Sequence, residues 1–292
     1  MSNHKRLHVK TLIESCIGTL PKRSPFVRIL PIFCLAVFAV PGFSGEIGED
    51  RLAPRFPYSR HKQMVHAAME KALAEKGIRL DDRTAKNWKR KLSRASLYQD
   101  FIKFFHSKAH FDNCNFRGGI EHINGHRRGI DRQYARLLNE SSPKARAKIR
   151  ENIMFRVGRI SHTIQDFFSH SNFTEIQSKS YSQIDLVPTP DFWNEIGQSE
   201  ILGMVSDGLV SAPYFWSFPR RCVGKTQVLV HKDHPNDRAG RVPTAWDDGT
   251  GSGTLTVYEA SFSFAERSTQ VLFREVFRNY EQMTKDPSVS VR

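Results

Sequence analysis

The sequence predicts a mainly α-helical fold: a single all-α domain of about five core helices, with a loop-rich insertion between the last two. Three observations support this prediction. Apolar residues recur every three or four positions over several long segments, capping and breaking residues bound those segments, and no internal repeat or low-complexity tract is visible. A chain of 292 residues is long enough for one large domain or two small ones.

The first four helices can be placed from their start and stop signals. Gly77 ends the first of them, and Asp81 or Asp82 can cap the second. Ser142 followed by Pro143 is a typical start for the fourth and longest helix. We therefore expect helices over residues 61–76, 82–104, 120–138 and 143–170.

The segment 176–255 is irregular and rich in Pro, Ser, Gly and Asp. An insertion of this length and composition is typical of a lid or site wall rather than of a second domain. Two short runs within or at the end of it, 227–230 and 254–257, are β-prone. A last helix is expected over about 258–283.

Residues 1–45 differ from the rest of the chain. Six Lys and Arg residues precede or border a 12-residue apolar run, 29–40, and small residues follow up to Gly45. This order is typical of a secretory signal peptide, and the run is short for a membrane span, which needs about 20 residues. We predict a signal peptide at 1–45, with an uncleaved N-terminal anchor as the alternative, and a helical domain at 46–292. The expected location is secreted or periplasmic.

The net charge is +14 for the whole chain and +9 without the leader. A basic exported protein is attracted to anionic membrane surfaces or to nucleic acid. The charge alone does not show whether it serves such binding or only keeps the protein soluble.

Beyond the leader the cysteines are Cys114 and Cys222, which can form a disulfide in an oxidising compartment. The absence of CxxC argues against a cysteine zinc site.

The helix that ends at His170 carries the strongest candidate site. His162, Asp166 and His170 recur every fourth residue, so they spread over about 80° of helix surface and can face one cleft. The opposite side carries the apolar residues Ile149, Ile153, Val157, Ile160, Ile164 and Phe168. We interpret the helix as one core face and one polar site face; a solvated face that carries two histidines is the alternative.

Three further potential ligands, His61, Asp100 and His110, lie near the ends of predicted helices. Zinc takes three or four such ligands, and clustered zinc ions share bridging carboxylates. If the second and fourth helices pack side by side, Asp100 and His110 would complete a four-ligand site with the fourth helix. Taken singly, each of the three has a plainer interpretation as a surface or helix-end residue.

Four motifs, in this order, resemble the zinc-dependent phospholipase C superfamily, which also includes the S1/P1-type nucleases. They are HKQMV (61–65), ASLYQD (95–100), HFDN (110–113) and HTIQDFFSHSNF (162–173). The HET-C-like branch is the most similar, and the resemblance covers residues 60–175 well and the C-terminal third weakly. It implies an all-helical fold and a zinc cluster that hydrolyses phosphodiester bonds.

The resemblance also implies a ligand set. One zinc would be held by Asp100, His110, His162 and Asp166. Asp166 would bridge to a second zinc, bound by His61 and by the amino group and carbonyl of the mature N-terminal residue. His170 would belong to a third zinc.

The third position departs from the family pattern, because the usual His-x-x-x-Glu pair after this helix is absent. Glu175 is expected to take part in its place, with His231 or Asp233 as alternatives. His66 is an alternative to His61. The expected cofactor is therefore Zn²⁺, as two or three ions.

The function that the resemblance implies is an exported zinc-dependent phosphodiesterase, a phospholipase C-like enzyme that acts on phospholipids through a metal-activated water. Asp100 is expected to orient or deprotonate that water, while Arg159, otherwise a solvated charge, and Asn172 would bind substrate. The alternatives are an S1/P1-type single-strand nuclease and a non-catalytic HET-C-like scaffold or interaction protein.

Aromatic residues of the insertion could line a lipid pocket, stack on bases or only pack the segment onto the helices. These are Phe192, Trp193, Tyr214, Phe215 and Trp216.

Overall fold

The fold is all-α, as the sequence predicts. The structure is a computed structural model, and it describes residues 58–103, 106–211, 255, 257–278 and 289–291, all within one unit, 53–292. Within these residues there are five long helices: α3 (Tyr58–Glu75), α4 (Asp82–Ile102), α6 (Phe116–Asn139), α7 (Pro143–His170) and α10 (Val257–Arg278). Shorter elements are α5 (Ser107–His110), α8 (Phe173–Gln177), η1 (Ile184–Leu186) and α9 (Glu195–Ser206).

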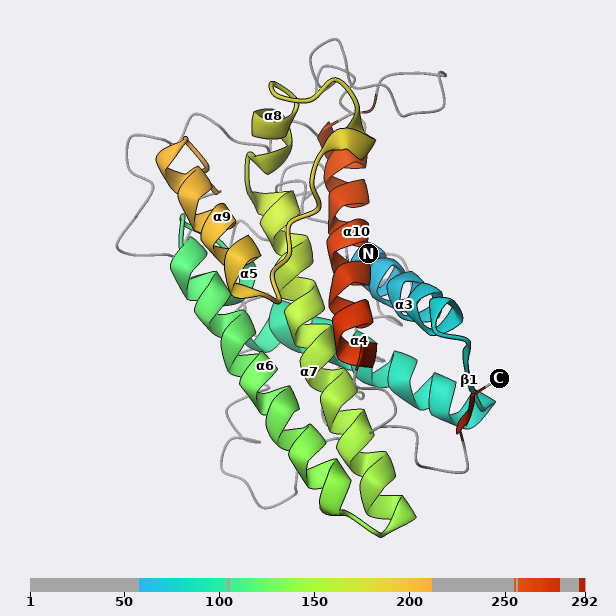
Figure 1. Cartoon of the computed structure of the whole chain (residues 1–292). Coiled ribbons are helices and arrows are strands. Elements are labelled where there is room, and N and C mark those ends of the chain that lie inside the picture. Colours follow the sequence, from blue (N-terminus) through green and yellow to red (C-terminus); the bar gives the residue numbers. More distant parts are fainter. Residues whose placement is uncertain (1–57, 104–105, 212–254, 256, 279–288, 292) are drawn as a thin grey trace, which may run out of the picture. The chain divides into compact units, whose positions relative to one another are not determined.

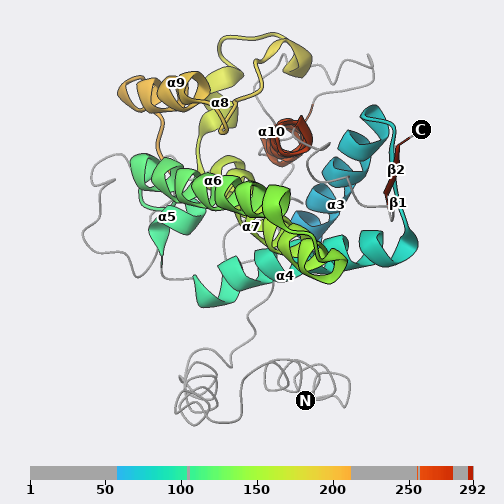
Figure 2. The same ribbon diagram turned by 60° about the horizontal axis from the view of Figure 1, so that its bottom comes forward.

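Helix α7 is the centre of this arrangement, and it contacts α3, α4, α5, α6 and α10 (Figures 1 and 2). It begins as predicted: the side chain of Ser142 accepts a hydrogen bond from the Ala145 N–H, and Pro143 occupies the first turn. From Ile160 to His170 every residue is buried. The alternative of a solvated face is therefore wrong, because His162, Asp166 and His170 are buried like the apolar residues of the helix.

Helix α4 approaches α7 closely at Gly158. A Cβ at that position would lie 2.8 Å from the backbone oxygen of Leu92 and 2.8 Å from the Ala95 Cβ. The N-terminus of α4 is capped as expected, with the Asp81 carboxylate accepting from the Thr84 N–H at 2.9 Å. The close crossing brings the C-terminal half of α4 against the ligand-bearing half of α7.

Helix α10 packs along α7 and α3, so it joins the last part of the fold to the first. Arg274 on α10 forms a bidentate ion pair with Glu75 on α3, with bonds of 2.7 and 2.8 Å. The Tyr134 hydroxyl on α6 donates to the backbone oxygen of Val276 on α10 at 2.6 Å. Two short strands, β1 (Ile78–Leu80) and β2 (Val289–Val291), pair antiparallel beside α3 (Figure 2).

Several boundaries differ from the predictions. Helix α6 begins at Phe116 rather than near residue 120, and the segment after α7 contains α8, η1 and α9 rather than only loops. Residue Val257, placed in a β-prone run, starts α10. The predicted leader, the run 227–230 and the expected end of the last helix lie outside the described residues. No helix among the described residues is long and apolar enough to cross a membrane.

Candidate metal centre

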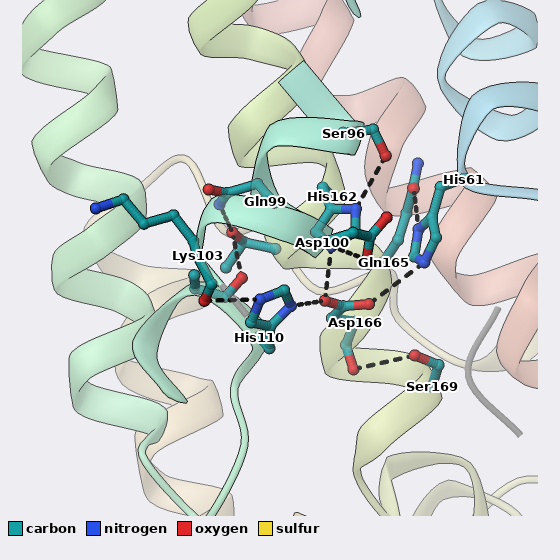
Figure 3. Close-up of polar contacts among 12 residues, drawn as sticks. His61, Ser96, Gln99, Asp100, Lys103, His110, His162, Gln165, Asp166 and Ser169 are labelled. Carbon is teal, nitrogen blue, oxygen red and sulfur yellow. Dashed lines mark hydrogen bonds and ion pairs between the residues drawn. The ribbon is translucent and has the colours of Figure 1, made fainter. Parts of the chain in front are cut away.

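The carboxylate of Asp166 lies among four imidazoles, three of which, those of His61, His110 and His162, are labelled in Figure 3. Its Oδ2 is 2.6 Å from His110 Nδ1 and 3.0 Å from His162 Nε2. Its Oδ1 is 3.4 Å from His61 Nε2 and 3.8 Å from His170 Nε2. The five residues are each 3% exposed or less, so this group of potential ligands is removed from solvent.

The outer nitrogen of His61 is held by an acceptor. The amide nitrogen of Gln165 donates to Ser161 at 2.9 Å and to Thr269 at 3.2 Å, so the amide oxygen faces the histidine. That oxygen lies 2.8 Å from His61 Nδ1, which therefore carries the proton. The inner nitrogen, Nε2, is left with its lone pair directed at Asp166.

Two other histidines are oriented in the same way. Nε2 of His110 lies 3.2 Å from the backbone oxygen of Lys103, and Nδ1 is the inner nitrogen, hydrogen-bonded to Asp166 Oδ2 at 2.6 Å. Nδ1 of His162 lies 3.0 Å from Ser96 Oγ, a hydroxyl that can either donate or accept, and Nε2 points inward. An outer partner of this kind is typical of metal-ligating histidines.

The fourth histidine is held by the loop between α5 and α6. Nδ1 of His170 donates to the backbone oxygen of His110 at 3.1 Å and lies 2.8 Å from Asp112 Oδ1. This loop is strained, because three non-glycine residues adopt left-handed conformations: Phe111 (φ 55°), Asn113 (φ 59°) and Cys114 (φ 53°). Strain of this kind costs free energy and is concentrated at functional sites.

The charge states of the group follow from its burial. Burial, followed by the repulsion of His162, lowers the pKa of His61 to about 4. Burial acts to raise the pKa of Asp166, but His162, His170 and the hydrogen bond from His110 outweigh it and hold that pKa well below the usual range. At neutral pH an ionised carboxylate thus faces the lone pair of at least one neutral imidazole, an arrangement that a cation would stabilise.

The donor atoms fit a metal ion in both type and spacing. His61, His162 and Asp166 each offer a ligand atom, and these atoms lie within 4.8 Å of one another. Two ligands of a tetrahedral zinc, each about 2.0–2.1 Å from the metal, lie about 3.3–3.4 Å apart. The separations of 3.4 Å and 3.0 Å between the histidine nitrogens and the Asp166 oxygens are close to that value. This buried group could therefore hold a metal ion.

Asp100 lies at the edge of this group. Its Oδ1 is 3.4 Å from His162 Nε2, and its side chain is 33% exposed, whereas the side chains of His162 and Asp166 are 3% exposed or less. Asp100 comes from the C-terminal part of α4, which the close crossing at Gly158 brings against α7. Among the predicted ligands around Asp166, Asp100 has the most exposed side chain.

Other predicted residues lie outside the cluster. His66, the alternative to His61, is wrong as a ligand of this group, because its Nε2 is 3.0 Å from the Lys89 backbone oxygen and from Ser93 Oγ. Glu175, in the first turn of α8, is not part of the ligand group that the described residues form. His231 and Asp233 lie outside the described residues.

The two predicted substrate-binding residues have structural contacts. Nε of Arg159 donates to Gln99 Oε1 at 3.1 Å, and its guanidinium lies 5.0 Å from the ring centre of Tyr98. Asn172 accepts from the Val210 N–H at 2.8 Å and donates to the Gly208 oxygen at 3.1 Å. The amide of Asn172 thus holds the chain after α9, and substrate binding by either residue stays a prediction.

The aromatic residues of the insertion divide into two groups. Phe192 is buried, and its ring centre is 5.1 Å from that of Phe167 and 5.9 Å from that of Phe111. Trp193 is half-buried, with the guanidinium of Arg127 5.9 Å from its ring. These two pack the segment onto the helices, and the aromatic residues 214–216 lie outside the described residues.

Three residues that orient the histidines were missed from the sequence: Ser96, Asp112 and Gln165. Asp112 had a signal, since it lies inside the HFDN motif two residues after His110. Ser96 and Gln165 also lie inside such motifs, ASLYQD and HTIQDFFSHSNF, but their role depends on the packing of α4, α7 and α10.

The cysteine prediction is supported in part. Cys114 is disulfide-bonded, and the predicted partner, Cys222, lies outside the described residues. The Ser211 N–H lies 3.4 Å from Cys114 Sγ, and the Cys114 N–H donates to Ser211 Oγ at 2.8 Å. The loop that carries Asp112 is thereby fixed to the end of the chain segment that follows α9.

Fold and site together define an all-helical protein with a buried His/Asp group that could hold a metal ion. The chain is similar to von Willebrand factor A domain-containing protein 7 of Mus musculus, with 28% identity over 163 residues. The match covers 51% of this chain but only 17% of that protein. No family model and no solved structure matches the chain.

Proposed function

We propose that this chain is an exported zinc-dependent phosphodiesterase that hydrolyses phospholipids, a phospholipase C-like enzyme. The observation that carries the proposal is the group of four histidines around Asp166, each with its outer nitrogen near a partner and its inner nitrogen directed toward the carboxylate, where it could bind a metal. Nitrogen and oxygen donors in this number suit zinc. The HET-C-like motifs in the sequence support the same class of chemistry.

The two oxygens of Asp166 support more than one zinc ion. Oδ1 faces His61 and His170, whereas Oδ2 faces His110 and His162. A carboxylate that presents each oxygen to a different pair of histidines has the arrangement of a bridging ligand. We therefore propose two ions held through Asp166; a third, with Glu175, has less support.

Asp100 is the proposed catalytic residue. Zinc, when bound, supplies a Lewis acid that lowers the pKa of a water and neutralises charge on a phosphate. The partly exposed Asp100 carboxylate, 3.4 Å from the buried His162, would accept a proton from an attacking water. Arg159 would bind a phosphate oxygen of the substrate through its terminal nitrogens.

Two other functions remain candidates, each favoured by one observation. The burial of the five central side chains is typical of a structural metal site, whose ligands leave no open position. This favours a HET-C-like scaffold or interaction protein. The net charge of +9 without the leader favours an S1/P1-type nuclease.

The test combines metal analysis with activity. We expect two or three zinc ions per purified wild-type chain and a lower content in Asp166→Asn, with Asp131→Asn, an exposed carboxylate on α6, as the matched control. We also expect hydrolysis of phospholipid vesicles that His162→Ala abolishes while the helical content stays intact. Release of nucleotides from single-stranded oligonucleotides without lipid hydrolysis would instead support the nuclease. A chain that holds no zinc after reconstitution would overturn the proposal of an enzyme.

A further inference from the structure

A second group of histidines lies on α6, and Gln99 of α4 connects it to the region of the metal centre. His122 and His126 are one turn apart on α6, and their rings meet edge to face with centres 4.7 Å apart. Four cationic residues act electrostatically on one or both of these histidines: Lys103 after α4, Lys108 on α5, and Arg156 and Arg159 on α7. Among the described residues, none of the four forms an ion pair with a carboxylate.

Gln99 fixes the orientation of the group. Its amide oxygen accepts from Arg159 Nε at 3.1 Å, so its amide nitrogen faces His122 Nε2 at 2.9 Å and donates to it. His122 therefore carries its proton on Nδ1. The terminal nitrogens of Arg159 have no hydrogen-bond partner in the part of the chain that the structure describes.

His126 adds a second, independent observation. The residue is only 8% exposed, and within the described ranges its buried Nδ1 has no hydrogen-bond partner. Buried polar atoms are nearly always paired with protein, ordered water or a ligand. A ligand bound beside His122, or a water molecule ordered by that ligand, would give His126 Nδ1 a hydrogen-bond partner.

The charges decide which kind of ligand fits. Two histidines one turn apart are a common pair of metal ligands, but four uncompensated cations would repel a metal ion. Burial, followed by the charge of Arg159, lowers the pKa of His122 to about 3 and that of His126 to about 2. A bound anion would attract the cationic side chains and protonated histidines, and it could accept hydrogen bonds from both.

We propose that His122 and Arg159, with Lys103 and Lys108 beside them, bind a phosphate-sized oxyanion at a site separate from the metal centre. Phosphate suits the bidentate geometry of a guanidinium whose Nε is already fixed by Gln99. The binding itself does not require a metal ion.

The position of the site suggests its use. Gln99 precedes Asp100 in α4, and its amide nitrogen also lies 3.2 Å from Thr163 Oγ1, next to His162. Figure 3 shows Gln99 and Lys103 on the side of His110 and His162 that faces away from His61. In a role that rests on the proposed function, the site would hold a second phosphate group of a substrate whose diester lies at the metal centre.

The experiment is a calorimetric titration of the chelator-treated full chain with inorganic phosphate, and then with glycerol phosphate. We expect millimolar or tighter binding that Arg159→Gln and His122→Asn each weaken at least about tenfold, the loss of one charge-assisted hydrogen bond. Lys148→Gln, an exposed cation on the same helix as Arg159, should bind as wild type. Tighter binding of glycerol phosphate would indicate a phosphate ester as ligand, and equal binding would indicate the free ion.

Three results would overturn the proposal: no binding of millimolar phosphate by the metal-free protein, equal binding in all variants, or a zinc content that falls in His122→Asn. Thermal denaturation of each variant shows whether it is folded. Failure of the proposed function would look different. In that case phosphate binding would persist in the metal-free chain while Asp166→Asn left both zinc content and turnover unchanged.

Discussion

Asp112 offers the sharpest test of how the histidines are organised. It is 1% exposed and lies 2.8 Å from His170 Nδ1, in the strained loop after α5. Asp112→Asn keeps the size of the side chain and an oxygen that can accept from His170, but it removes the negative charge that makes this imidazole a stronger donor to a metal. The change therefore tests how strongly Asp112 polarises His170, while His170 itself stays in place as a ligand.

The expected effect is a loss of zinc affinity of about 10- to 100-fold, or about 1.4–2.8 kcal/mol. Competition with a chromophoric chelator measures this affinity directly, and circular dichroism of the same samples shows whether the helices are intact. Asp131→Asn serves as the exposed control. The reasoning is refuted if Asp112→Asn binds zinc as tightly as wild type, or if it loses as much affinity as Asp166→Asn, since Asp112 would then not act through His170.

Three further predictions concern stability. Gly158→Ala should destabilise the fold by about 1–3 kcal/mol, because the added methyl would lie 2.8 Å from the Leu92 oxygen; the midpoint of chemical denaturation measures this. The metal-free protein in phosphate-free buffer should lose stability as the pH falls below 6.5, because the unfolded chain takes up protons that His126, with its pKa of about 2, does not. At pH 5 this residue accounts for a loss of about 2 kcal/mol, so thermal melts at pH 7 and 5 should differ less in His126→Gln, and an equal difference would contradict the assignment. Glu75→Gln, which breaks the largely exposed pair with Arg274, should change the free energy of unfolding by less than about 1 kcal/mol, and a larger change would show that this pair matters more than its exposure implies.

The long helices were predictable because their signals are local. The start of α7 at Ser142 and Pro143, the cap of α4 at Asp81 and the turn at Gly77 all depend on residues a few positions apart. Each pairs a backbone requirement with a side chain that meets it. Such signals can be read from the sequence however the helices are arranged in space.

The start of α6 was misplaced because of its glycines. Gly119 was taken as part of a loop, whereas in the structure it lies inside the helix and lets the ring of Phe111 approach. A Cβ there would lie 2.3 Å from the ring. Gly197 has a similar role in α9, where a Cβ would lie 2.2 Å from the Asp191 oxygen. A glycine required by tertiary packing cannot be told from a loop glycine by sequence alone.

The candidate site was predictable in its donors but not in its surroundings. The spacing of His162, Asp166 and His170 follows from helix geometry alone. The choice of His61 over His66 does not, because both lie on α3 and only packing against α7 separates them. The same holds for Gln165, whose orientation is set by contact with α10.

The contact of α3 with α10 has a consequence for the order of assembly. His61 belongs to the first described helix, but α10, against which that helix packs, comes about 200 residues later. Contacts between such distant segments form late in folding, because a large loop must close first. Helix α3 also contacts α4 and α7 directly, but its more extensive contact is with α10, so we expect His61 to be held firmly beside Asp166 only once the C-terminal quarter of the chain has been made. We expect the complete donor set, and with it tight metal uptake, to belong to the finished chain.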